Sequence, residues 1–178
     1  MEVAILSDTH IPEQEQRIPD DFRRRVREAD CVVHAGDFGS KDALADVRAL
    51  ASDLTAVYGN ADPNDVDLPA VASVEVGGVT FVVVHGIVNV VDSAVSSSEG
   101  VVMNRDDWLD AVADATRARA DEPMVGIGGH THEVEDTVHD GVRLLNPGSA
   151  TGVGRAEGAT MMTVEVADDD LSVTLHEA

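Results

Sequence analysis

Residues 3–10, VAILSDTH, introduce the pattern that decides the fold of this chain. The apolar run at 3–6 stops at polar residues, which predicts a buried strand leading into a loop that carries Asp8 and His10. The same pattern returns in residues 31–37, CVVHAGD, and in residues 54–62, LTAVYGNAD. Helices are predicted between these strands at 20–28 and 40–49, the second with Ser40 as its N-cap. Strands that alternate with helices indicate parallel crossovers, in which polar residues beyond the carboxyl ends of the strands line the ligand crevice.

The second half of the chain changes character, because hairpins replace crossover helices. Strands at 71–76 and 79–84 flank Gly77-Gly78, and the second strand runs into His85-Gly86. A predicted helix at 106–119 precedes a strand at 124–127 that ends in Gly128-Gly129-His130-Thr131-His132. Further hairpins are predicted at 133–138 with 142–145 and at 159–166 with 171–175, and the Ser-rich segment 92–100 is predicted to be a loop. We expect an α/β fold in one domain spanning 1–178, with two packed mixed sheets and helices outside.

The charge balance of the chain is strongly acidic. It has 34 acidic and 12 basic residues, a formal net charge of −22, and Lys41 as its only lysine. Such a charge repels nucleic-acid backbones, so we expect no nucleic-acid partner, and we interpret the acid excess mainly as a solubility feature. Its Asp-rich, Lys-poor form resembles proteins of salt-adapted organisms, which is a hypothesis about habitat.

Other compositional features narrow the class of protein further. No apolar stretch approaches the roughly 20 residues of a membrane span, and Met1-Glu2 leads into the first strand without a basic signal-peptide start, so we expect a cytoplasmic protein. Cys31 is the only cysteine, which excludes an internal disulfide and a thiolate metal cluster. We expect Cys31 to be buried.

Seven side chains of metal-binding types follow the ends of successive predicted strands. They are Asp8, His10, Asp37, Asn60, His85, His130 and His132. Any one alone is an ordinary turn former or a hydrogen-bonded polar residue, but their recurrence at strand ends indicates a metal site. The i, i+2 spacing predicts that Asp8/His10 and His130/His132 each hold a metal, with Asp37 as the bridging carboxylate. Imidazole, carboxylate and amide ligands without thiolate favour Mn, Zn, Fe or Co and disfavour a structural zinc site.

Six motifs, in this order, resemble those of the calcineurin-like metallophosphoesterases, most closely their small YfcE-type phosphodiesterase branch. The motifs are Asp8-Thr9-His10, Gly36-Asp37, Gly59-Asn60, His85-Gly86, Gly129-His130-Thr131-His132 and Asn146-Pro147-Gly148-Ser149. The resemblance, which spans residues 3 to 155, implies a four-layer α/β-β/α sandwich. It implies one divalent ion on Asp8, His10, Asp37 and His132, and a second on Asp37, Asn60, His85 and His130. Manganese is the first expectation, with Zn, Fe, Co or Ni as alternatives.

The resemblance also implies roles in catalysis. The two ions would lie about 3.5 to 4 Å apart, activate a shared hydroxide and clamp the phosphoryl oxygens. Asp37, Asn60 and His85 are then the expected catalytic residues, with Asn60 and Arg155 as substrate contacts. Arg155 could bind a phosphate through its bidentate fork, although a surface ion pair is the simpler alternative.

This chain departs from the family pattern at two positions. Ala61 stands where many relatives carry a histidine that protonates the leaving group, a role typically worth about 10²- to 10⁴-fold in rate. Slow turnover, or a preference for good leaving groups, is therefore expected. Asp62 could act as the proton donor through a water, but we favour a hydrogen-bonding or turn role for it. Ile87 stands where relatives often carry a further histidine, so His85 would be the only histidine ligand from this loop.

The predicted function is hydrolysis of small phosphoesters, favouring diesters, by this metal pair. The rival interpretation is a weakly active or inactive metal-binding scaffold, because the same fold resemblance extends to the retromer subunit, which works as a scaffold. A metal-dependent nuclease fits the chemistry but conflicts with the acidic surface. Whether the chain forms a homo-oligomer is left open.

Overall fold

The computed structural model describes residues 1–12, 17–86, 104–154, 158–167 and 170–178. Three helices lie within these residues: α1 (Asp20–Glu28), α2 (Lys41–Leu50) and α3 (Arg105–Arg117). Ten strands accompany them: β1 (Glu2–Leu6), β2 (Cys31–His34), β3 (Leu54–Ala56), β4 (Val71–Val76), β5 (Val79–Val84), β6 (Met124–Ile127), β7 (Val134–His139), β8 (Val142–Pro147), β9 (Thr160–Ala167) and β10 (Asp170–Glu177). Arg155, Ile87, the predicted loop 92–100 and residues 168–169 lie outside the described residues.

The strands form two five-stranded sheets. The first has the order β10-β9-β1-β2-β3 and the second the order β4-β5-β6-β8-β7. In the first sheet β1, β2 and β3 are parallel, while β9 runs antiparallel to β1 and pairs with β10. In the second sheet β5, β6 and β8 are parallel, with antiparallel β4 and β7 at the edges. Both sheets are therefore mixed, as predicted.

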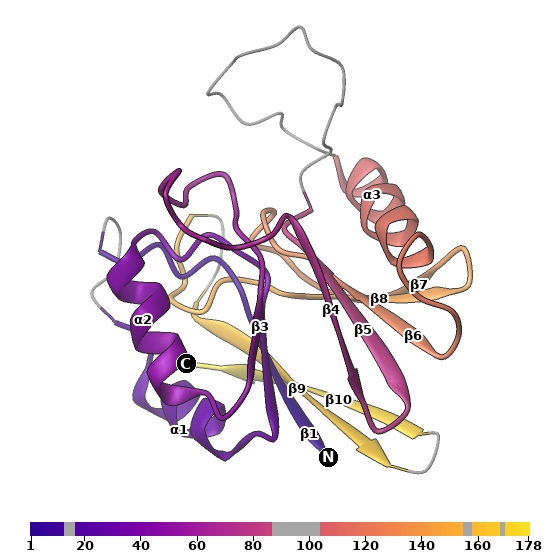
Figure 1. Ribbon diagram of the computed structural model, residues 1–178, viewed down its shortest axis with the longest axis horizontal. Helices are drawn as coiled ribbons and strands as arrows, with labels where there is room; N and C mark the ends of the chain where they lie inside the picture. Colours follow the sequence, from indigo (N-terminus) through magenta and orange to yellow (C-terminus); the bar gives the residue numbers. More distant parts are fainter. Residues whose placement is uncertain (13–16, 87–103, 155–157, 168–169) are drawn as a thin grey trace, which may run out of the picture.

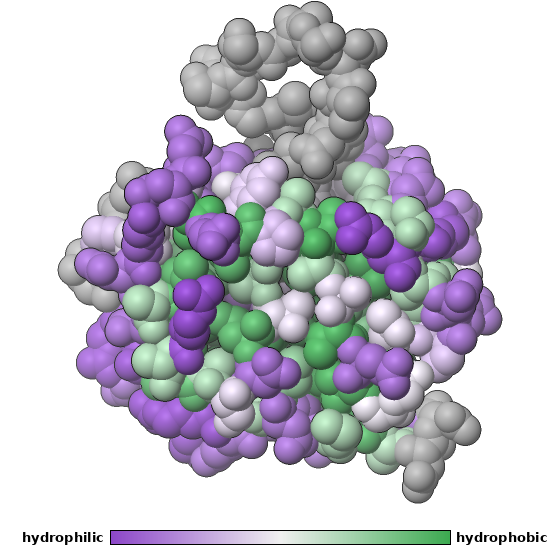
Figure 2. All heavy atoms as spheres, viewed as in Figure 1, coloured by the Kyte–Doolittle hydropathy of each residue, from purple (hydrophilic) through white to green (hydrophobic). Residues whose placement is uncertain are grey.

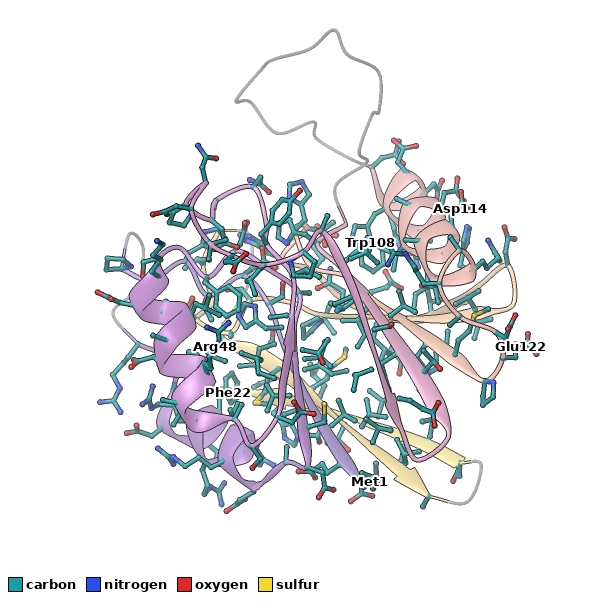
Figure 3. All side chains as sticks on the ribbon, viewed as in Figure 1. Met1, Phe22, Arg48, Trp108, Asp114 and Glu122 are labelled. Atoms are coloured by element: carbon teal, nitrogen blue, oxygen red, sulfur yellow. The ribbon has the colours of Figure 1, made fainter. Side chains whose placement is uncertain are left out.

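The two sheets and three helices make four layers (Figure 1). Phe22 and Val26 of α1 and Leu44 of α2 pack on the outer face of the first sheet. Trp108 and Leu109 of α3 pack on the outer face of the second sheet. In Figure 3 the labelled Phe22 and Trp108 point from their helices toward the sheets. The predicted α/β-β/α sandwich is confirmed.

The inner faces of the sheets meet in a core made mostly of valine. Val3 and Ile5 of β1 belong to this core, whereas Ala4 and Leu6 face the helices, because successive side chains of a strand point to opposite faces. Residues 3–6 are thus buried on both sides, which explains why the strand reads as a continuous apolar run.

Local sequence signals account for the ends of several elements. Ser40 caps α2, since its side chain accepts a hydrogen bond of 3.1 Å from the backbone N–H of Ala43, as predicted.

Cys31 is buried as predicted, and burial raises the pKa of its thiol to about 11. None of the helices in the described ranges is long and apolar enough to cross a membrane. Figure 2 shows hydrophilic residues around the periphery of the molecule, with apolar residues visible in the middle of that face.

Candidate metal centre

All seven predicted ligands lie just beyond the carboxyl ends of strands. The first sheet contributes Asp8 and His10 after β1, Asp37 after β2 and Asn60 after β3; the second contributes His85 after β5 and His130 and His132 after β6. Four of these residues, Asp8, His10, Asp37 and His85, are buried, and Asn60 is exposed. The site therefore sits at the seam between the two sheets, with Asn60 on its solvent side.

One group of donor atoms gathers around Asp8. His132 Nε2 lies 3.1 Å from Asp8 Oδ1 and 3.3 Å from His10 Nε2, while His10 Nε2 lies 3.5 Å from Asp37 Oδ2. Ligand atoms that share an ion at 2.0–2.2 Å lie about 3 to 4 Å from one another. These spacings therefore suit a common ion.

A second group gathers on the other side of Asp37. His85 Nε2 lies 3.2 Å from Asp37 Oδ2 and 3.1 Å from Asn60 Oδ1. His130 Nδ1 lies 2.9 Å from the same Asn60 oxygen. Asp37 Oδ2 faces histidines of both groups, so this single oxygen lies between the two groups of donor atoms.

The predicted pairing of His130 with His132 is wrong. His132 joins Asp8 and His10, whereas His130 joins Asn60 in the other group. The i, i+2 argument assumed extended backbone, but His130 and His132 have φ values of 71° and 59°. Both residues lie beyond the end of β6 in left-handed backbone, where the alternation of strand side chains does not apply, and each belongs to a different group.

Left-handed backbone is concentrated in the candidate ligands. Among the described non-glycine residues with positive φ, five are candidate ligands, namely Asp8, His10, Asp37, His130 and His132, and the sixth is Asp140 in a hairpin turn. Each such residue costs about 1–3 kcal/mol and persists only where its surroundings impose it, typically at functional sites. Left-handed backbone thus marks five of the seven residues that the sequence pattern marks.

The outer nitrogens of two histidines fix how their rings face the centre. Nδ1 of His85 lies 2.6 Å from the carbonyl oxygen of Ala35, and Nδ1 of His132 lies 3.0 Å from that of Val153. A carbonyl only accepts, so each Nδ1 carries the hydrogen and each neutral ring presents the Nε2 lone pair inward. These Nε2 lone pairs lie next to oxygens of Asp8, Asp37 and Asn60, which carry no hydrogen either. Acceptors that face one another in this way fit a cation between them.

Asp8 supports the same conclusion. Its Oδ1 is buried and has no hydrogen-bond partner within the described part of the chain. His132 Nε2 lies 3.1 Å away and can donate to it only when the imidazole is protonated, because Nδ1 carries the hydrogen of the neutral ring. An ion between the two atoms would satisfy both, so the donor set fits a bound metal.

The carboxylates of Asp8 and Asp37 favour protonation of a nearby histidine. Burial acts to lower the pKa of His85, but its hydrogen bond to Asp37 and the charge of Asp8 outweigh burial and raise the pKa to about 9. Burial acts to raise the pKa of Asp8, but the imidazoles of His10 and His132 beside its carboxylate outweigh burial and lower the pKa below its usual range. The centre therefore attracts positive charge.

Residues that sequence reasoning did not assign to the site hold its loops. Asn146 is fully buried, and its Nδ2 donates to Gly129 O (3.1 Å) and Thr131 Oγ1 (2.9 Å), on either side of His130. Ser149 Oγ donates to the backbone oxygen of Asp8 (2.8 Å). The turn predicted at 146–149 is only partly present, because Asn146 and Pro147 end β8 and the chain leaves the strand at Gly148, which has a φ of 78°. The segment also anchors two ligand loops. Polar residues placed directly after the apolar pair Leu144-Leu145 were the signal for this role.

Two other predicted positions have structural roles. The Asp62 carboxylate accepts hydrogen bonds from backbone N–H groups, which confirms the hydrogen-bonding role favoured for it. His34 at the end of β2 is buried and stacks on Phe38 with ring centroids 3.7 Å apart.

Comparison with known proteins identifies related sequences over almost the whole chain. The family described as the calcineurin-like phosphoesterase superfamily domain matches residues 1–169. A protein of Methanothermobacter thermautotrophicus named "Probable metallophosphoesterase" is 29% identical over 181 residues, which cover 98% of this chain and 91% of that protein. A protein of the same description from Methanocaldococcus jannaschii is 30% identical, over 94% of this chain and 77% of that protein.

Solved structures with the same fold cover the whole chain. A Vps29 single mutant from Entamoeba histolytica has a TM-score of 0.73 and 25% identity, covering 100% of this chain and 98% of that one. Wild-type Vps29 of that organism, solved in complex with zinc, has a TM-score of 0.72 at 24% identity, with 100% and 98% covered. A Thermotoga maritima protein solved by NMR has a TM-score of 0.68 and 29% identity, covering 99% of both chains.

Proposed function

Because the chain belongs to the calcineurin-like phosphoesterase superfamily, we propose that it is a phosphoesterase that uses two divalent ions to hydrolyse phosphate diesters. The observation that carries this proposal is the convergence of lone pairs from seven side chains with Asp37 Oδ2 between the two groups. A site built only to stabilise the fold has no need for an exposed donor such as Asn60.

We assign one ion to Asp8, His10, Asp37 and His132, and the other to Asp37, Asn60, His85 and His130. Manganese is the first candidate, and Zn, Fe, Co and Ni are alternatives, because ligands of this kind accept all of them. When bound, such an ion pair lowers the pKa of a water and clamps phosphoryl oxygens during in-line displacement.

The residues of the chain position the reacting groups. The carbonyl oxygens of Ala35 and Val153 hold the rings of His85 and His132, so their Nε2 atoms cannot turn away from the centre. Asn60 directs Oδ1 at His85 and His130, which leaves its Nδ2 to donate to a phosphoryl oxygen of the substrate. Arg155 remains a predicted substrate contact outside the described residues.

Ala61 shapes the choice of substrate. Its methyl group cannot donate a proton, and the Asp62 carboxylate next to it is occupied by backbone N–H groups. The leaving group must then depart without a proton from either residue. We therefore expect rates to fall steeply as the pKa of the leaving alcohol rises, with aryl diesters cleaved far faster than alkyl diesters.

Hydrolysis of an activated aryl phosphodiester with added manganese tests the proposal. Asp37→Asn should abolish turnover, because it removes the negative charge shared by the two ion positions. Asp42→Asn, at an exposed position of α2, is the matched control and should retain activity. Failure to hydrolyse any ester across a panel of divalent ions would contradict the enzyme proposal.

A scaffold function is the second candidate, because the Vps29 structures share this fold over the whole chain. A scaffold would bind ions and a protein partner without turning over esters. Measuring turnover and partner binding on the same preparation separates the two functions. Cleavage of single-stranded DNA at high salt would instead point to a nuclease.

A further inference from the structure

The bridging candidate Asp37 is held by a second acidic residue that contacts no candidate metal ligand side chain. Asp62 follows the Asn60 loop, and its carboxylate accepts three backbone hydrogen bonds: Oδ2 from Asp37 N (3.0 Å) and Gly59 N (2.8 Å), and Oδ1 from Gly39 N (3.1 Å). Hydrogen bonds to an ionised acceptor are about twice as strong as neutral ones. The carboxylate thus joins the loop after β2 to the loop after β3.

Asp37 returns the contact. Its Oδ1 accepts a hydrogen bond of 2.7 Å from the backbone N–H of Ala61, the residue directly before Asp62. The two loops therefore hold each other reciprocally, with each carboxylate bonded to the backbone of the other loop. Because Oδ1 is occupied, only Oδ2 of Asp37 faces His10 (3.5 Å) and His85 (3.2 Å).

The backbones of these loops are in direct contact. A Cβ on Gly59 would lie 2.1 Å from Asp37 Oδ1, and a Cβ on Gly36 would lie 2.8 Å from Gly59 N. Asp37 lies beyond the end of β2, so its peptide N–H is outside the strand pairing and needs an acceptor elsewhere. Asp62 supplies that acceptor.

We propose that Asp62 is a positioning residue whose clamp on the Asp37 loop makes Asp37 a bridge through the single oxygen Oδ2. This inference rests on the proposed metal centre. It assigns the acid after Asn60 to the geometry of the ion pair rather than to proton transfer.

The test compares Asp62→Asn with Asp67→Asn. Asparagine keeps the size of the side chain but turns an NH2 group toward a backbone N–H, so at least one of the three bonds is lost. Asp67→Asn removes the same charge from an exposed position of the same segment and leaves the clamp intact. Each purified full-length variant is titrated with Mn²⁺ by calorimetry, and the Mn²⁺ spectrum is recorded by electron paramagnetic resonance.

We expect Asp62→Asn to weaken Mn²⁺ binding about 10- to 100-fold, as loss of partners behind a ligand does. The exchange-coupled signal of two bridged ions should give way to the signal of isolated Mn²⁺, and kcat should fall while KM stays constant. Asp67→Asn should match the wild type in Mn²⁺ affinity, in the coupled signal and in kcat. An Asp62→Asn protein with wild-type Mn²⁺ affinity and coupling would overturn the proposal.

A second variant decides the matter if Asp62→Asn does not fold. Asp62→Glu keeps the charge but displaces the acceptor oxygens by one methylene, so it should fold and still lose the coupled signal. An unchanged coupled signal in Asp62→Glu overturns the proposal. A wild type that binds two Mn²⁺ ions but hydrolyses no ester would refute the proposed function alone, because the binding and spectroscopic comparison of the variants still stands.

Discussion

Gly59 offers a sharp test of how closely the two ligand loops must approach. In Gly59→Ala the new Cβ would lie 2.1 Å from Asp37 Oδ1 and 2.6 Å from Asp37 N, whereas real Cβ atoms essentially never come within 3.0 Å of such atoms. The Asp37 carboxylate must therefore move by about 1 Å, and a misplacement of that size at a reacting centre can reduce the rate about 10²-fold. Crowding of this kind destabilises a fold by about 1–3 kcal/mol.

The assay combines kcat for an aryl phosphodiester, Mn²⁺ affinity and thermal unfolding. For a chain of this size the crowding corresponds to a fall in Tm of roughly 2–12 °C. Gly78→Ala is the matched control, since its Cβ would meet nothing within 4 Å although its φ is 83°. It should lose about 1–2 kcal/mol of stability from backbone strain but keep kcat. The reasoning fails if Gly59→Ala keeps kcat and Mn²⁺ affinity within twofold of the wild type.

Further predictions concern pH, the Asn146 anchor, metal loading and salt. Burial lowers the pKa of His34 from 6.5 to about 3. As the pH falls, the unfolded chain therefore binds a proton at His34 before the folded chain does. Stability should therefore fall by up to about 1.4 kcal/mol per pH unit between pH 6.5 and 3, and urea unfolding of His34→Gln should lack this contribution. Asn146→Asp replaces a donor to Gly129 and Thr131 with an acceptor, and chemical denaturation should show a loss of about 1–3 kcal/mol. Saturating Mn²⁺ at 100 times its Kd should stabilise the fold by about 2.7 kcal/mol, and Asp37→Asn should reduce that gain in a thermal scan. If the net charge of −22 reflects adaptation to salt, Tm should rise steeply with KCl, and a Tm that is insensitive to salt would contradict the habitat hypothesis.

The elements of the fold could be read from the sequence because hydrophobic period and turn chemistry agree along most of the chain. The continuous apolar run at 3–6 is buried on both faces, as a parallel central strand requires. Gly77-Gly78 and Asp140-Gly141 mark hairpins that the structure contains. Within the pattern at 54–62 the apolar run 54–58 predicts a strand, but β3 ends at Ala56, since Val57 and Tyr58 already lead into the ligand loop.

The ligand types could also be predicted from the strand-end pattern, whereas their division into two groups follows from the family resemblance and not from the i, i+2 spacing. His130 and His132 lie beyond the end of β6 in left-handed backbone, so the side-chain direction that strand spacing implies does not apply to them. A hydrogen-bonding role was predicted for Asp62, but the partners of Asp62 and Asn146 were not, because they include groups on loops distant in the sequence. Such contacts depend on how the loops meet in space.

The distribution of the ligands over two sheets has a consequence for biogenesis. Each proposed ion position combines side chains made early, such as Asp8 and Asp37, with histidines made much later, and β9 must then return to pair with β1. A growing chain on the ribosome therefore cannot capture either ion until most of the domain has been synthesised. Metal uptake would report a finished fold, and a truncated chain would remain metal-free and open to degradation.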